Sequence, residues 1–197
     1  MNSIPISWIV VAGVSIIALL VLAGWVLSKR KKQSLRLQQR FGPEYGRTVD
    51  ELGGRAKAES ELKAREKRVE HLNITALAPS EAARFSEAWG ELQSRFVDNP
   101  KGVVMQADQL VRELMLKRGY PMGDFEHRAA DISVDYPTVV DNYRAAQAIA
   151  IRDHRGEANT EDLRQAVVHY RALFDELLEV REAKQGVLVA KPIPVPA

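Results

Sequence analysis

The polar residues whose spacing comes closest to that of a catalytic or metal site lie between residues 124 and 135. His127, Asp131 and Asp135 are spaced four positions apart, so one helical face could carry an imidazole and two carboxylates, all of them ligands for divalent metals. Two helix starts explain the same residues: Asp124 as an N-cap and Asp135 near the positive end of the next helix, with His127 and Asp131 paired on the surface. We therefore predict neither a metal site nor a cofactor here.

Other chemistry lacks its usual sequence signature. The chain of 197 residues has no cysteine, which excludes thiolate nucleophiles, disulfides and iron–sulfur clusters. The phosphate loop GxxxxGK[ST], the dinucleotide motif GxGxxG, the zinc-protease motif HExxH and the nucleophile elbow GxSxG are all missing. The four histidines are scattered along the chain: His71, His127, His154 and His169. We predict no catalytic residue and no enzymatic activity, with an unrecognised site near Asp131 and Asp135 as the enzyme alternative.

The N-terminal segment has a different composition from the rest of the chain. The first 28 residues carry no charged side chain. Residues 4–27 are 24 mostly apolar residues, roughly 36 Å as a helix, which is enough to cross a membrane. Trp8 and Trp25 lie near its two ends and would fit the two membrane interfaces. The sequence predicts an N-terminal transmembrane helix over 4–27.

A cluster of six basic residues follows this segment before the first acidic residue, Glu44: Lys29, Arg30, Lys31, Lys32, Arg36 and Arg40. Basic flanks stay on the cytoplasmic side. The expectation is therefore a single-pass protein of the bacterial inner (plasma) membrane, with its N-terminus outside and its C-terminal domain cytoplasmic. Trp8, Trp25 and Lys29 to Lys32 are the expected interface residues, in contact with the lipid bilayer. The whole cluster could also bind anionic phospholipid.

The remaining residues have the composition of a water-exposed helical protein. Residues 41–197 hold 22 basic and 26 acidic residues, a net charge of −4, and the two signs are interleaved, so no nucleic-acid partner is expected. Residues 28–43 form a basic segment before the body. Residues 44–78 predict a long exposed charged helix and a linker, with Glu59–Lys63 and Glu61–Arg65 as ion pairs one helical turn apart.

Residues 79–183 predict a bundle of about five helices. Pro79 suits a first helical turn, and Asn99, Asp124 and Thr160 suit N-caps. Thr160 would cap the last helix, which carries the clearest apolar stripe in the chain. No alternating strand pattern competes, so the expected fold class is all-α: one transmembrane helix, a long charged helix and a soluble bundle. Residues 184–197 contain three prolines and predict a disordered tail.

Several segments of the body resemble a known family. RFGPEYGRTV, RVEHLNI, RFVDNP, RGYPMGDFEHRAADISVDYP and TEDLRQAVVHYRALF are similar to a bacterial family of uncharacterised single-span membrane proteins, some of whose members are labelled secreted. The most specific block runs from residue 118 to residue 137. The resemblance implies a bacterial inner membrane; it implies no activity and no site residue.

These observations favour a non-enzymatic protein-interaction or adaptor module, displayed at the inner membrane and engaging an unidentified protein partner. The alternative is a structural protein of the membrane surface that associates with further copies of itself, through the charged helix, the bundle or the basic cluster.

Overall fold

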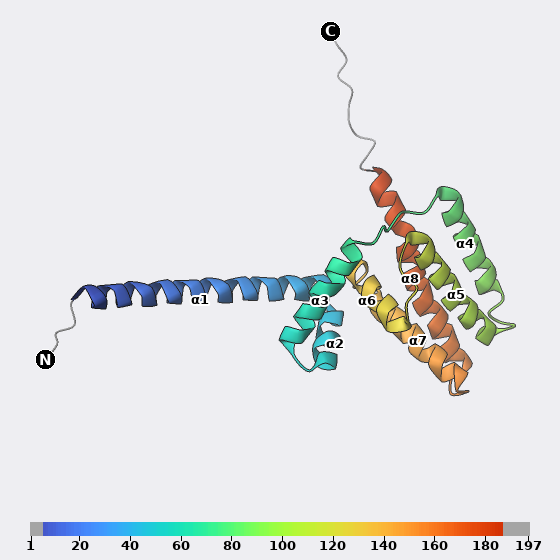
Figure 1. The fold of residues 1–197 in the computed structure, drawn as a ribbon. Coiled ribbons are helices and arrows are strands. Elements are labelled where there is room, and N and C mark those ends of the chain that lie inside the picture. The colour runs from blue at the N-terminus through green and yellow to red at the C-terminus, as the bar shows by residue number, and fades with distance from the viewer. Residues whose placement is uncertain (1–5, 187–197) are drawn as a thin grey trace, which may run out of the picture.

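The fold, taken from a computed structural model, is entirely helical over the residues that the structure describes. These are residues 6–186, with side chains described for residues 21–178 except 23 and 26. The first helix, α1 (Ile6–Phe41), has 36 residues and is therefore about 54 Å long. It projects away from the other seven helices, which it reaches only with its C-terminal end (Figure 1). The predicted all-α class is confirmed.

The predicted transmembrane helix and inner-membrane location require correction. Among the residues that the structure describes, no helix is long and apolar enough to cross a membrane. Trp8 and the other predicted span residues before Val21 have side chains outside the described part of the chain.

The segment predicted as one long charged helix forms two helices instead. These are α2 (Pro43–Leu52) and α3 (Arg55–Glu70). They are separated by Gly53, whose φ of 65° lies in the left-handed region that glycine adopts without a steric penalty. The reversal lays α3 back along α2 and across the end of α1 (Figure 1). We call α2, α3 and the C-terminal end of α1 the N-terminal unit.

Five further helices form the bundle that the proline and capping residues of the sequence predict. They are α4 (Pro79–Ser94), α5 (Pro100–Arg118), α6 (Phe125–Asp135), α7 (Val140–His154) and α8 (Thr160–Gly186). The Asn99 and Asp124 side chains accept hydrogen bonds from backbone N–H groups three residues on, as predicted for N-caps. The cap of α8 is Asn159 rather than Thr160, because the Asn159 side chain accepts from the N–H of Asp162. The tail was predicted from residue 184, but residues 184–186 belong to α8, and residues 187–197 lie outside the described residues.

Two hydrophobic clusters hold these parts together. The larger one fills the bundle around Trp89, which is fully buried, with its ring centroid 4.6 Å from that of Phe174. The smaller one joins the N-terminal unit to α6 and contains Leu37, Phe41, Tyr45, Leu62, Val69 and Val134. The end of α1 is therefore part of the folded body, since Leu37 and Phe41 are almost completely buried.

Candidate functional site

A large cavity lies where the N-terminal unit meets the bundle. It is an open cleft of about 1240 Å³. Its walls come from α1 and α3, and its floor from the loop after α3, the end of α5 and the end of α6. The lining residues are Arg36, Arg40, Lys63, Glu66, Lys67, Val69, Glu70, His71, Leu72, Ile74, Arg118, Val134, Asp135 and Tyr136. We call this the basic cleft.

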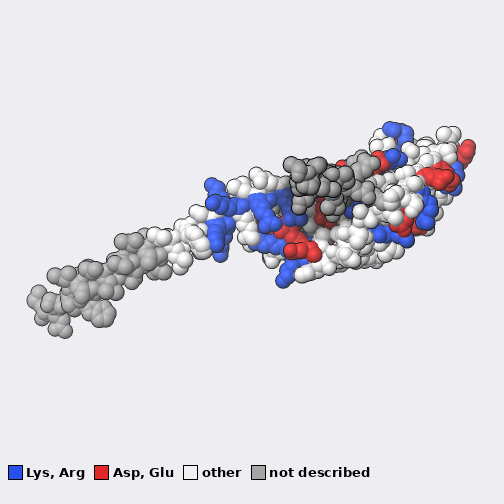
Figure 2. Space-filling model, turned by 90° about the horizontal axis from the view of Figure 1, so that it is seen from above, with Lys and Arg blue, Asp and Glu red and all other residues white. Residues whose placement is uncertain are grey.

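Positive charge predominates in the lining, with five Lys and Arg side chains against three carboxylates. Glu66 accepts from Arg36 at 3.1 Å and from Arg40 at 2.9 Å, so two guanidinium groups share one carboxylate. Lys63 and Lys67 form no ion pair with any residue that the structure describes. Figure 2 shows Lys and Arg side chains gathered where α1 reaches the body.

The arginine at the floor of the basic cleft is buried. Arg118 is 3% exposed, and its Nη1 donates to the Tyr136 hydroxyl and to the Leu177 carbonyl, both at 2.7 Å. Its Nε is buried and finds no hydrogen-bond acceptor in the described part of the chain. The charge of Arg118 thus lies in surroundings of low polarity, where its field is screened less than that of an exposed arginine.

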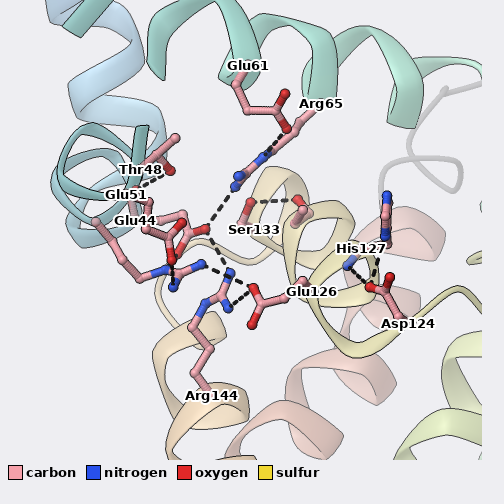
Figure 3. A network of polar contacts seen from close by, with 12 residues as sticks. Glu44, Thr48, Glu51, Glu61, Arg65, Asp124, Glu126, His127, Ser133 and Arg144 are labelled. Atoms are coloured by element: carbon pink, nitrogen blue, oxygen red, sulfur yellow. Dashed lines mark hydrogen bonds and ion pairs between the residues drawn. The ribbon is translucent and has the colours of Figure 1, made fainter. Parts of the chain in front are cut away.

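A second polar cluster fastens the N-terminal unit to the bundle (Figure 3). Glu44 of α2 is completely buried. Its carboxylate accepts from Arg65 of α3 at 2.8 Å, from Arg144 of α7 at 3.1 Å and from Arg47 at 3.0 Å. Arg144 also donates to Glu126 of α6 at 2.6 Å. We call these five residues the Glu44 network.

The charge of Glu44 depends on these arginines. Burial by itself raises the pKa of a carboxyl group, but Arg144 and Arg47 outweigh that effect, and the pKa of Glu44 lies below its ordinary value. Glu44 is therefore ionised at neutral pH. The three arginines belong to three different helices, Arg47 to α2, Arg65 to α3 and Arg144 to α7. The network therefore resembles a structural clamp rather than a site with a reactive group open to substrate.

The residues considered for a metal site do not converge. His127 contacts Asp124, with Nδ1 and Oδ1 2.9 Å apart, so the predicted surface pair between His127 and Asp131 is wrong. Asp131 is instead buried and accepts from Arg68 of α3 at 2.8 Å. Asp135 ends α6 rather than opening the next helix, and its carboxylate accepts from the Tyr120 hydroxyl at 2.6 Å.

The residues predicted to lie at a membrane interface are exposed where they are described. Trp25 is 55% exposed, and the Lys29 ammonium lies 3.9 Å from the centre of its ring. Arg30, Lys31 and Lys32 are exposed along the same helix. Arg36 and Arg40, assigned from the sequence to the same basic cluster, instead line the basic cleft and pair with Glu66.

One of the two ion pairs predicted in the charged segment forms. Glu61 pairs with Arg65 at 3.0 Å, whereas Glu59 lies near Arg55 at 3.6 Å instead of pairing with Lys63.

Sequence reasoning missed most of the basic cleft. One signal was available, because Arg36 and Arg40 are four residues apart, as are Lys63 and Lys67. Each pair therefore shares a helical face.

Comparisons with protein-family models, with curated proteins and with solved structures found no match to this chain. The fold class and the geometry of its sites are therefore the basis for any statement about function.

Proposed function

We propose that this chain is a non-enzymatic protein-interaction module whose binding surface is the basic cleft. The observation that carries the proposal is the size and lining of this cavity. Pockets for small molecules typically measure about 300–1,000 Å³ and are lined mainly by apolar and aromatic side chains. The basic cleft is larger, at about 1240 Å³, and its rim consists of long charged side chains, which suit a polypeptide segment better than a small substrate.

The way in which the titratable groups are used supports the same proposal. The buried carboxylates of Glu44 and Asp131 form ion pairs with arginines, and the Tyr120 hydroxyl donates a hydrogen bond to the carboxylate of Asp135. Glu44 joins α2 to α3 and α7, Asp131 joins α6 to α3, and Asp135 joins α6 to the loop after α5. Each group therefore has a structural role that opposes its release to react with a substrate. A scaffold fixed in this way presents a rigid surface, which reduces the entropic cost of binding a partner.

The experiment is site-specific photo-crosslinking of the full chain in the cells that produce it. A photoreactive amino acid is placed at position 63 or 67 on the rim of the basic cleft. The matched control position is 97, because Val97 lies between α4 and α5 and is 89% exposed. The proposal expects adducts from the rim positions, absent from the control, in which mass spectrometry identifies a different protein.

Two outcomes would overturn the proposal. One is an equal yield of adducts at the rim and control positions. The other is adducts composed only of two copies of this chain, which would support the alternative of a self-associating structural protein.

A further inference from the structure

The chemistry of the basic cleft indicates what kind of segment it takes. We propose that the basic cleft binds an acidic, extended segment of a partner protein in which carboxylates alternate with apolar residues. This inference rests on the proposed function and adds the identity of the occupant to it.

The first argument is charge complementarity. Five cationic side chains face three carboxylates in the lining, and Glu66 is shared between Arg36 and Arg40. An incoming carboxylate therefore meets cations whose charge the cleft itself does not neutralise. Arg118 at the floor adds a positive charge that is 3% exposed and is only weakly screened by water. An acidic partner would be attracted to this surface and a basic one repelled.

The second argument is preorganisation. Long cationic side chains lose rotamer freedom when they bind, which costs about 0.5–1.5 kcal/mol for each one immobilised. Glu66 already holds the guanidinium groups of Arg36 and Arg40 at 3.1 and 2.9 Å. Part of the ordering cost is thus met before any partner arrives, and the two arginines keep a defined spacing.

The third argument is that spacing. Arg36 and Arg40 are four residues apart on α1, and Lys63 and Lys67 are four residues apart on α3, which corresponds to about 6 Å along a helix axis. Alternate residues of an extended chain project to the same side about 6.6 Å apart. Carboxylates at every second position of an extended segment therefore match both cation pairs.

The fourth argument is the apolar floor beneath the charged rim. Leu72 and Ile74 are half-buried and offer apolar surface in the lining, whereas Val69, Val134 and Tyr136 are buried and offer little. In an extended segment the residues between the carboxylates point to the opposite side, so apolar side chains there would pack against this floor. A nucleic acid fits less well, because its bases stack on exposed aromatic rings and Tyr136 is only 6% exposed.

The test uses the full chain and a fluorescein-labelled peptide of about eight residues that alternates Glu and Leu. Binding is followed by fluorescence anisotropy. We expect saturable binding that weakens several-fold between about 50 and about 300 mM salt, because charges at an open cleft are screened. A Lys–Leu peptide of the same pattern should not bind. A peptide with the same Glu and Leu residues in two separate blocks should bind at least about fivefold more weakly, because only one of its sides matches the cleft.

The variant for the test is K63E/K67E, because neither lysine forms an ion pair within the described part of the chain, so the substitution breaks no ion pair of the fold. We expect it to weaken binding by at least about tenfold. The matched control, R84E/R155E, makes the same change of charge at exposed positions on the bundle that form no ion pair within the described part of the chain, and it should keep binding within about twofold of the wild type. Circular dichroism melts establish that both variants fold.

Three results would overturn the inference: no binding of the Glu–Leu peptide, equal binding by K63E/K67E, or tighter binding of a single-stranded octanucleotide that K63E/K67E abolishes. The last would identify a site for a phosphate backbone. These failures are separate from failure of the proposed function, because rim-specific crosslinks to a protein could persist when the acidic peptide does not bind. In that case the interaction module would stand and its acidic occupant would not.

Discussion

Replacing Glu44 with glutamine should destabilise the protein more than any change to a surface ion pair. The carboxylate is fully buried and shared by Arg65, Arg144 and Arg47. Glutamine has nearly the same shape but no charge, so two of these guanidinium groups, with side chains 7% and 13% exposed, would lose a buried counter-charge. Removing one partner of a buried ion pair typically costs about 3–5 kcal/mol.

The lower end of that range applies here, because the arginines keep other partners. Arg144 still donates to Glu126, and Arg65 still donates to Glu61. We therefore expect E44Q to lower the free energy of unfolding by about 3 kcal/mol. For a domain of this size, each kcal/mol changes the melting temperature by about 2–4 °C, so the melting temperature should fall by about 6–12 °C.

The assay is thermal unfolding of the full chain, followed by circular dichroism. The control is D175N, which removes an exposed i,i+4 pair with Arg171 whose side chains are about 40% exposed. Such pairs contribute about 0.3–0.5 kcal/mol, so D175N should melt within about 2 °C of the wild type. If E44Q and D175N melted together, the Glu44 network would not hold the N-terminal unit to the bundle.

The pH dependence provides an independent check on the same residue. The pKa of Glu44 is lower in the folded protein than its ordinary value, so its charge stabilises the fold above the ordinary carboxyl pKa, and this stabilisation disappears as the pH falls through the folded pKa. The difference in stability between wild type and E44Q should therefore be largest near neutral pH and should shrink in acid. A difference that stayed constant down to low pH would contradict the assigned role of the charge.

Three further substitutions test local features by the same melts. N99A removes the side-chain cap of α5, a hydrogen bond of 3.0 Å, and should cost about 1 kcal/mol; no change would mean that the cap is replaced by water. G119A places a Cβ 2.5 Å from the backbone oxygen of Asn73 at a φ of +96° and should cost about 2–4 kcal/mol; wild-type melting would contradict that close approach. Y136F removes the hydroxyl that accepts from buried Arg118 and should cost about 1–3 kcal/mol; a smaller loss would mean that the guanidinium finds another acceptor.

The bundle helices were predictable because their signals are local. Pro79 begins α4, Asn99 caps α5 and Asp124 caps α6, as their positions in the sequence indicate. Each signal acts over three or four residues, since a cap satisfies backbone N–H groups in the first turn of its own helix. The cap of α8 was misplaced by one residue for the same local reason, because Asn159 and Thr160 are both good capping residues.

The N-terminal unit was harder to predict because its buried face contains charge. Ala58, Leu62, Arg65 and Val69 lie on one face of α3 and are all buried, but an arginine in that series makes the segment look exposed on every side. Arg65 pairs with Glu61 one turn away, but its fully buried counter-charge is Glu44, 21 residues away. The partner on α7 lies 100 residues from Glu44, and no pattern in a single sequence identifies an ion pair over that distance.

The basic cleft exists only because these long-range contacts form. Its walls belong to α1 and α3, whereas Val134, Asp135 and Tyr136 belong to the bundle side. The Glu44 network and the Arg68–Asp131 pair cross the junction beside it, and the smaller hydrophobic cluster closes the junction from within. The buried charges that made the N-terminal unit hard to predict from the sequence therefore also set the distance between the two sides of the cleft. The shape of the binding surface thus depends on residues that do not line it.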